Sequence, residues 1–493
     1  MDGFKIANEF YHDKEVADRG NQSIGTGTRF NPTSPFAPAG DLTAFFGSPT
    51  YNNTFADVQT GMAVVEHDFG NGLTVKNSSL YADFSRAYQN VYPGSSVAGG
   101  TFNYNAYNHT TNRENAFNQT DFIYKTMTGP VRHTIAFGTE FDRQTGIDLR
   151  NTGIFASTGS SSAPGDPFNP TFFGNINFIH QFPGAFSPGV STADSFSTYK
   201  LFVDSAYAQD QIEVTRWLQL IAGARFDRFD FGATDQNTGI FRHRIDDTYS
   251  PRAAVIVKPV DNLSLYTAYS ISYLPSAGDQ FSAINTGSAL IPPQKFENTE
   301  FGLKWNILPK LQYTAAVYQL NRTNVPLAIG GGLFAISGSN IIKGFETALT
   351  GYVTKDWQTT LGYAYTDARI GSDTNSSTAV NPPPPTILKG NVVQLVPFNQ
   401  FSWWNRYQID PVWAAGLGVI YFSDSYASSD DTVRLPGFVR FDAALYARIN
   451  ENWRAQLNIE NIFNTGYWAT ADGNNNISPG QGRTVRLRAT YRF

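Results

Sequence analysis

The last residues of the chain alternate between apolar and polar side chains. From Val485 to Phe493 every second residue is apolar or aromatic, and the residues between them are Arg486, Arg488, Thr490 and Arg492. Because successive side chains of a strand point to opposite faces, this pattern predicts a strand with one apolar and one strongly polar face. An edge strand of a soluble sheet alternates in the same way. A transmembrane barrel also fits, since lipid would cover the apolar face and a watered lumen would solvate the arginines.

Tight turns and long connections alternate along the chain. Gly70–Gly72 separates two such segments, 56–69 and 73–88, and its residues tolerate the positive φ of a hairpin turn. Counting these segments predicts about eighteen strands. Short turns on one rim and long loops on the other favour an outer-membrane barrel over a soluble sandwich. The other tight turns are predicted at 129–130, 215–216, 260–262, 308–310, 354–356, 410–411 and 450–452, and the long loops at 14–55, 89–111, 145–195, 234–246, 274–293, 325–340, 371–391, 425–435 and 464–481.

The composition agrees with a membrane protein built from strands. Aromatic residues make up 15% of the 493 residues and charged residues only 16%, against about 25% charged in ordinary soluble domains. No run of about 18 apolar residues offers a membrane helix. Cysteine is absent, which suits an exported protein. The net charge of −5 and the lack of a basic run argue against a nucleic-acid partner.

Four tryptophans share a position in this pattern. Trp217, Trp357, Trp413 and Trp453 all fall at or just after tight turns. Tryptophan is enriched at both surfaces of a membrane, so we interpret these residues as an aromatic belt at the tight-turn rim. The alternative is that they cover the turns as core residues.

Short segments over nearly the whole chain carry a resemblance to a known family. In this order they resemble the TonB-dependent siderophore receptors of the outer membrane. The segments are EFYHDKEVADRG at 9–20, FFGSPTYNNTFADV at 45–58, AYAQDQIEV at 206–214, GARFD at 223–227, LYTAYSISYLP at 265–275, KFENTEFGLKW at 295–305, AAVYQLNRTNV at 315–325, IKGFETALTG at 342–351, LGYAYTDARI at 361–370, NIENIFNTGYW at 458–468 and the terminal Phe493.

Some of these segments have a physical rationale in a barrel wall. Gly344 suits a place where a side chain would crowd the wall. Arg225, Asp227 and Glu346 would place charges in the lumen that can pair with one another. We interpret these residues as structural.

The resemblance implies a fold, a location and a set of partners. The fold would be all-β: one transmembrane antiparallel up-and-down barrel domain over residues 1–493, in the outer membrane of a Gram-negative bacterium. The transported ligand would be a ferric siderophore, of catecholate type by the segment GNNNISPGQGRTVR at 473–486. The implied partners are outer-membrane lipid, the TonB energy-coupling complex and the barrel assembly machinery, with Tyr491 and Phe493 as the assembly signal.

The chain also departs from the family it resembles. Full-length receptors have a signal peptide, a box that contacts the coupling protein, a globular plug and a barrel of about 22 strands. The first residues here, MDGFKIANEFYHD, lack the features of a secretory signal. The first recognisable segment resembles the fifth barrel strand. We therefore expect a barrel that lacks its plug and its first strands, and coupled uptake only if a plug is supplied.

Candidate ligand-binding residues lie in the predicted long loops. A ferric siderophore is a bulky, often anionic complex that aromatic faces and guanidinium groups can hold. For any single aromatic residue, packing of the loops against each other is an equally good explanation. The candidates are Arg19, Arg29, Phe45, Phe46, Tyr51, Tyr92, Tyr104, Tyr107, Phe172, Phe173, Arg242 and Arg244.

No enzyme is predicted. The six histidines show no metal-ligand spacing, and the chain has no nucleophile elbow, phosphate loop or dinucleotide fingerprint. No metal site and no covalent cofactor are expected. Two alternatives to a siderophore receptor stay open: a passive, porin-like or vestigial barrel, and a surface barrel whose loops bind other proteins.

Overall fold

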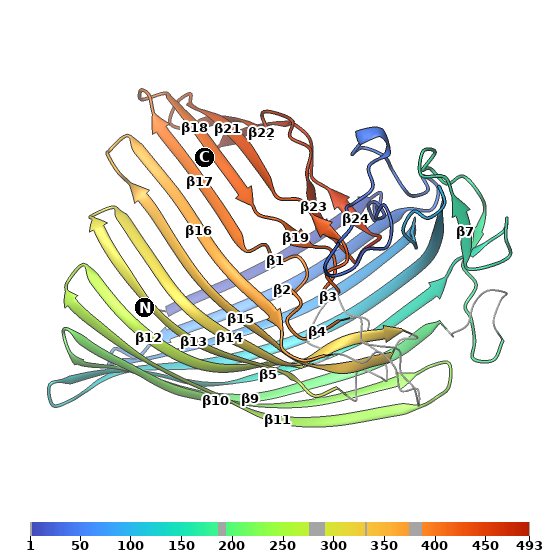
Figure 1. Ribbon diagram of the computed structural model, residues 1–493. Coiled ribbons are helices and arrows are strands. Elements are labelled where there is room, and N and C mark those ends of the chain that lie inside the picture. The colour runs from blue at the N-terminus through green and yellow to red at the C-terminus, as the bar shows by residue number, and fades with distance from the viewer. Residues whose placement is uncertain (1, 186–193, 276–290, 331–332, 374–386, 493) are drawn as a thin grey trace.

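The fold is a single curved wall of long antiparallel strands. A computed structural model describes residues 2–185, 194–275, 291–330, 333–373 and 387–492. In Figure 1 the tight turns lie toward the left and the long connections gather at the right. The only helix in this part of the chain is the short 3-10 helix η1 (Pro38–Gly40). Within the described residues, no helix is long and apolar enough to cross a membrane.

Eighteen strands follow one another around the main sheet, each paired with its neighbour along the chain, and the short β7 (Ser162–Gly165) adds to β4 to make nineteen. The predicted count of about eighteen is confirmed. The eighteen are β1 (Asp2–Glu15), β2 (Asn53–Asp68), β3 (Leu73–Pro93), β4 (Phe102–Thr128), β5 (Val131–Thr152), β9 (Ser195–Thr215), β10 (Leu218–Asp235), β11 (Phe241–Val260), β12 (Leu263–Leu274), β13 (Gln294–Leu308), β14 (Leu311–Gly330), β15 (Leu333–Tyr352), β16 (Trp357–Ile370), β17 (Asn399–Gln408), β18 (Trp413–Phe422), β21 (Phe438–Arg448), β22 (Trp453–Glu460) and β25 (Thr484–Tyr491).

The wall has two free edges in the described part of the chain. There, β1 pairs with β2 alone, and β25 pairs with β22 alone. Each of these strands therefore presents one row of backbone N–H and C=O groups that no other described strand satisfies. Such edges are not tolerated in lipid, where every backbone polar group needs a partner.

The two faces of the wall differ as the sequence pattern predicts. On β25, Val485 and Leu487 are 63% and 78% exposed on the outer face, whereas Arg486 points to the other face, 3.6 Å from Glu460. Of the four predicted belt residues, Trp217, Trp413 and Trp453 are 43 to 52% exposed beside the tight turns. The fourth, Trp357, is half-buried and donates a 3.0 Å hydrogen bond from Nε1 to Asn405. The outer face thus offers apolar and aromatic side chains to lipid, and the inner face lines a polar lumen.

Several segments predicted as loops are strands instead. The expected loop 89–111 is mostly the ends of β3 and β4, and 145–195 begins with eight more residues of β5. The expected loop 234–246 shrinks to the few residues between β10 and β11. These stretches lack an apolar outer face because they extend beyond the lipid. Pairing still satisfies their backbone, so the strands continue into water.

Small structures formed by the loops cover the long-loop end. Their largest apolar cluster centres on Phe46, Phe102, Tyr104 and Phe155, and a second packs Val433 and Ile477 with neighbouring small residues. The short strands of this region are β6 (Ile154–Phe155), β8 (Ile176–Asn177), β19 (Ser425–Tyr426), β20 (Arg434–Leu435), β23 (Trp468–Ala471) and β24 (Ile477–Pro479).

Glycines on the inner face let tyrosines lie sideways across the wall. Tyr318 on β14 stands directly opposite Gly344 on β15, and a Cβ at Gly344 would lie only 2.5 Å from the Tyr318 hydroxyl. The predicted need for glycine at 344 is therefore confirmed. The same cross-strand arrangement recurs for Tyr266 with Gly302, Tyr207 with Gly138 and Tyr199 with Gly146.

Candidate functional site

A cluster of aromatic and charged side chains lies on the inner face near the long loops. Tyr88 of β3, His109 of β4 and Asp148 of β5 form its centre. The Tyr88 hydroxyl and His109 Nδ1 are 2.8 Å apart, and His109 Nε2 lies 2.8 Å from Asp148 Oδ2. His109 and Asp148 are almost fully buried. Three neighbouring strands thus hold the imidazole in one orientation, between a phenol and a carboxylate.

Aromatic rings and guanidinium groups extend this cluster toward the loops. Tyr107 contacts both Tyr88 and Tyr92 edge to face, with ring centroids 5.6 and 5.4 Å apart. The Arg150 guanidinium carbon lies 3.9 Å from the Tyr107 ring centre, and that of Arg86 lies 4.8 Å from the Tyr88 ring. Cations over tyrosine faces are attracted by the ring quadrupole. The cluster therefore combines stacking surfaces with positive charge.

Arg113, four residues after His109 on β4, supplies a buried positive charge further from the long loops. It stands opposite Gly146, which in turn stands opposite Tyr199. Because Gly146 has no side chain, Tyr199 reaches across β5 and its hydroxyl accepts a 2.8 Å hydrogen bond from Arg113 Nε. Arg113 is only 4% exposed, and its Nη2 has no hydrogen-bond partner among the described residues.

Arg19 enters the same cluster from the loop between β1 and β2. It forms an ion pair with Asp472, from a loop 453 positions away in sequence. Burial opposes the charge on this guanidinium, but Tyr107 and Asp472 outweigh that effect and raise the pKa of Arg19. We name Arg19, Arg86, Tyr88, Tyr92, Tyr107, His109, Arg113, Asp148, Arg150 and Tyr199 the upper cluster.

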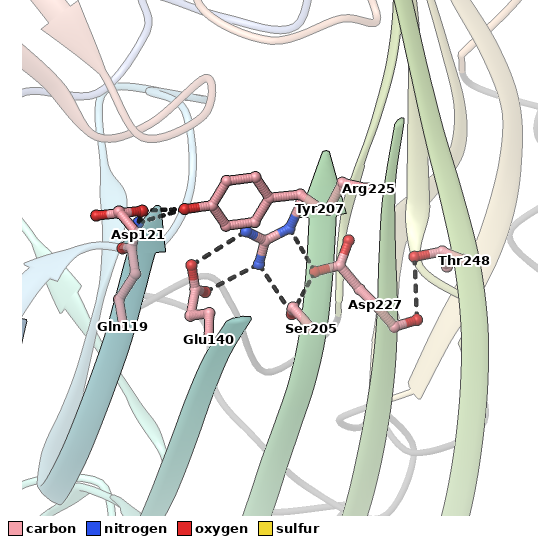
Figure 2. A network of polar contacts seen from close by, with 8 residues as sticks. All are labelled: Gln119, Asp121, Glu140, Ser205, Tyr207, Arg225, Asp227 and Thr248. Atoms are coloured by element: carbon pink, nitrogen blue, oxygen red, sulfur yellow. Dashed lines mark hydrogen bonds and ion pairs between the residues drawn. The ribbon is translucent and has the colours of Figure 1, made fainter. Parts of the chain in front are cut away.

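A second group, the wall network, lies further toward the tight turns. Figure 2 shows its eight side chains reaching toward one another across β4, β5, β9, β10 and β11. Arg225 donates to both oxygens of Glu140 at 3.1 and 2.9 Å, to Ser205 at 2.9 Å and to Asp227 at 2.7 Å. Its three guanidinium nitrogens all have partners. The predicted Arg225–Asp227 pair is thus confirmed, whereas Glu346 belongs to another part of the wall and lines a hollow with Tyr266.

Tyr207 joins the wall network to β4 by the same sideways arrangement. It lies over Gly138 and donates to Asp121, and Gln119 donates to Asp121 at 2.8 Å. A hollow of about 760 Å³ opens beside the network, and Leu201, Val203 and Phe229 form its apolar side. This volume lies in the range of small-molecule sites.

Three of the predicted ligand residues, Arg19, Tyr92 and Tyr107, belong to the upper cluster. The other aromatic candidates mostly pack the loops. Phe46 and Tyr104 are buried in the loop cluster, where Tyr51 and Phe172 pack against them. The ring of Phe45 lies against Gly47, and Phe173 is 78% exposed.

The remaining predicted cations are spread over the loop rim. Arg29 lies 5.8 Å from the Phe30 ring in a loop, Arg242 is exposed at the end of β11, and Arg244 is paired with Asp246 at 2.6 Å. The Tyr491 ring packs beside Trp453 on the outer face, with centroids 5.0 Å apart. Phe493 lies outside the described residues. The ligand role of the candidate residues stays a prediction.

Sequence reasoning missed most of the upper cluster. Tyr88, His109 and Asp148 lie in segments predicted as strand or neutral loop, and only the register of β3, β4 and β5 brings them together. One signal was available, since His109, Arg113 and Asp148 alternate onto one face once these segments are read as strands. In the described part of the chain, no group of three His, Cys, Asp or Glu side chains could hold a metal ion.

The family model described as TonB dependent receptor-like, beta-barrel matches residues 7–462. The chain belongs to this family. It is therefore an outer-membrane barrel of the Gram-negative type, with its tight turns on the periplasmic side and its long loops outside the cell.

Named relatives are similar over most of this chain. A probable TonB-dependent siderophore receptor, PiuA of Acinetobacter baumannii, is 27% identical over 462 residues, 88% of this chain and 60% of the relative. The catecholate siderophore receptor Fiu of Escherichia coli is 25% identical over 500 residues, 92% of this chain and 62% of the relative. The crystal structure of PiuA superposes with a TM-score of 0.84 at 22% identity, covering 99% of this chain and 71% of that one. The chain spans about three fifths of the length of these curated relatives, and they are receptors rather than enzymes.

Proposed function

We propose that this chain is the barrel wall of a receptor that binds ferric siderophores at the upper cluster. The observation that carries the proposal is the cluster itself, in which arginines and tyrosine faces converge on the inner face below the outer loops. Asp148 Oδ1, Arg113 Nη2 and Arg19 Nε are buried there without a hydrogen-bond partner among the described residues. Unsatisfied polar atoms of this kind are costly unless water or a ligand meets them.

The chemistry of the cluster favours a catecholate complex. Three catecholate groups around ferric iron leave a strongly anionic complex with aromatic rings at its surface, whereas three hydroxamates leave a neutral one. Guanidinium groups attract the anion, and tyrosine faces stack on the rings. The name of the relative Fiu, a catecholate siderophore receptor, agrees with this choice.

Transport itself needs parts beyond this wall. We propose that one barrel domain forms when further strands pair with the free edges of β1 and β25, and that a plug and the TonB complex then energise uptake. The free edges and the three-fifths coverage of the relatives support this arrangement. Folding would depend on outer-membrane lipid and the barrel assembly machinery.

Binding can be tested with the chain after it has been assembled in bacterial outer membranes and extracted into detergent micelles. The probes are the ferric tris-complex of 2,3-dihydroxybenzoate and a neutral ferric trihydroxamate, followed by quenching of tryptophan fluorescence. The catecholate complex should bind, and Arg150→Gln should weaken it about tenfold, as expected for one charged hydrogen bond. The control Arg132→Gln removes a 71% exposed guanidinium at the opposite rim and should leave affinity unchanged.

Three results would contradict the proposal: no binding of either complex, equal loss in both variants, or preference for the hydroxamate. Steady ion conductance in planar bilayers without any ferric complex binding would support the passive channel instead.

A further inference from the structure

Five arginines converge on the inner face at the tight-turn end, far from the upper cluster. They line one hollow of about 730 Å³ formed by β17, β21, β22 and β25. Of the described residues that line this hollow, none is an aspartate or glutamate. We name Arg406, Arg448, Arg454, Arg488 and Arg492 the arginine patch.

The strand register forces these like charges together. Arg448 stands directly opposite Arg454 across β21 and β22. Arg488 stands opposite Gln456, which puts it on the diagonal from Arg454. Directly opposed side chains lie about 5 Å apart at Cβ, and like charges at that distance destabilise a sheet. Arg406 is half-buried and the other four arginines are exposed, so water screens part of this repulsion, and an anion between the guanidinium groups would relieve it further.

Some other arginines of the inner face have a carboxylate at the second position along the same strand. Asp227 serves Arg225 in this way, and Asp442 accepts a 2.8 Å hydrogen bond from Arg440. Arg244 with Asp246 repeats the pattern. In the arginine patch, the residues at this second position that line the hollow carry no charge. They are Gln408, Tyr446, Gln456 and Thr490.

Within the described residues, the arginine patch therefore has no internal counter-charge. Across the described ranges, none of its five guanidinium groups forms an ion pair with a carboxylate. The one side-chain hydrogen bond in the patch joins Arg406 Nη2 to Gln408 Oε1 at 2.8 Å, and Arg406 also lies 5.1 Å from the Tyr446 ring centre. A concave surface lined by charges of one sign focuses its field and concentrates counter-ions.

We propose that the arginine patch is a binding site for a small, multiply charged oxyanion that carries phosphate or carboxylate groups. Guanidinium forks match both groups with paired hydrogen bonds. The volume of the hollow suits a small molecule, and its position places the ligand in the periplasmic mouth of the lumen. This site does not involve the upper cluster, and we infer it for the wall alone, because the plug proposed above would enter the same lumen.

Isothermal titration calorimetry with tripolyphosphate tests the site, on the full chain assembled in bacterial outer membranes and extracted into detergent micelles. We expect binding that persists at physiological salt and weakens about tenfold for each of Arg454→Gln and Arg488→Gln. The matched control is Arg216→Gln, which removes an exposed arginine at the tight turn between β9 and β10, on the same rim but outside the hollow. Far-ultraviolet circular dichroism, and gel electrophoresis of unheated samples compared with heated ones, show whether each variant folds.

The alternatives give different results. Absence of binding at physiological salt, or the same loss with Arg216→Gln, would show only general attraction of anions and would overturn the site. A glutamate-rich peptide that binds more tightly than tripolyphosphate, and loses affinity in the same two variants, would assign the arginine patch to a polypeptide and overturn the small ligand.

Discussion

Gly146→Ala is the substitution that most directly tests how the upper cluster is built. A Cβ at this position would lie 2.6 Å from the Tyr199 hydroxyl and 2.7 Å from Cζ of the same ring, and closer still to the Asn112 carbonyl oxygen. Neither contact can be relieved by turning a flexible side-chain end, because one partner is backbone and the other a buried ring. Tyr199 must therefore leave its place over β5.

The cost has two parts. Crowding a packed site by one methyl group typically costs about 1–3 kcal/mol. Displacing Tyr199 also removes the acceptor for Arg113 Nε, and leaving a buried charged donor unpaired costs about 1.5–3 kcal/mol more. We expect a total near 3–5 kcal/mol, at the high end for single substitutions. Tyr199→Phe keeps the ring and loses only the acceptor, so it should cost about 1.5–3 kcal/mol.

Urea unfolding of the chain extracted from outer membranes into detergent micelles, followed by tryptophan fluorescence, measures these free energies. Gly61→Ala is the matched control in another strand, because its Cβ would meet only the end of the Asn8 side chain at 3.4 Å. It should change stability by less than about 1 kcal/mol. A Gly146→Ala variant within about 0.5 kcal/mol of the wild type, or one more stable than Tyr199→Phe, would refute the sideways tyrosine as the support of Arg113.

Two further outcomes follow from the wall and the loops. Arg225→Met leaves Glu140 and the buried Asp227 without their shared partner, so it should lower the free energy of unfolding in urea by about 2–4 kcal/mol, a value below that of a fully buried pair because Arg225 is 31% exposed. The control Arg228→Met removes an exposed ion pair and should cost under about 1 kcal/mol. Equal costs for the two variants would contradict the wall network. Burial raises the pKa of Asp431 in the loop between β18 and β21, where the carboxylate accepts from the Val392 amide. The folded loop therefore holds the Asp431 carboxyl proton more tightly than the unfolded loop does, and the stability of the loop falls as pH rises from the ordinary aspartate pKa through the raised value. Hydrogen exchange of the Val392 amide should show that fall when the wild type is compared with Asp431→Asn at each pH. The same pH dependence of exchange in both proteins would contradict the prediction.

The sequence predicted the barrel wall well because the wall follows local rules. Alternation assigns each strand two faces, and tight turns set the hairpins, so Val485 and Leu487 were placed on the outer face before any pairing was known. The loop limits were wrong where strands leave the lipid. In 89–111 the outward positions no longer need to be apolar, and the alternation that marks a membrane strand disappears even though the ladder continues.

The upper cluster could be predicted only in part because it depends on register between distant segments. Arg19 and Tyr107 were chosen for their chemistry, but their neighbours are set by long-range contacts such as that of Arg19 with Asp472. The link between Arg113 and Tyr199 needs a glycine at one position of the intervening strand. A shift of one residue would replace Gly146 with a side chain and turn every partner to the other face.

The inner face carries two kinds of charged site, and the difference between them agrees with the two ligand sites proposed above. In the wall network Arg225 has a partner for every guanidinium nitrogen, so that site has no capacity left and serves to hold five strands together. Among the described residues, Arg113 keeps a nitrogen without a hydrogen-bond partner, and the arginine patch keeps whole guanidinium groups without carboxylates. These open sites lie near the outer loops and at the tight-turn rim, while the saturated network lies between them. A wall whose middle arginine is fully paired, and in which Arg113 and the arginine patch lack carboxylate partners among the described residues, is suited to receiving an anion at either end.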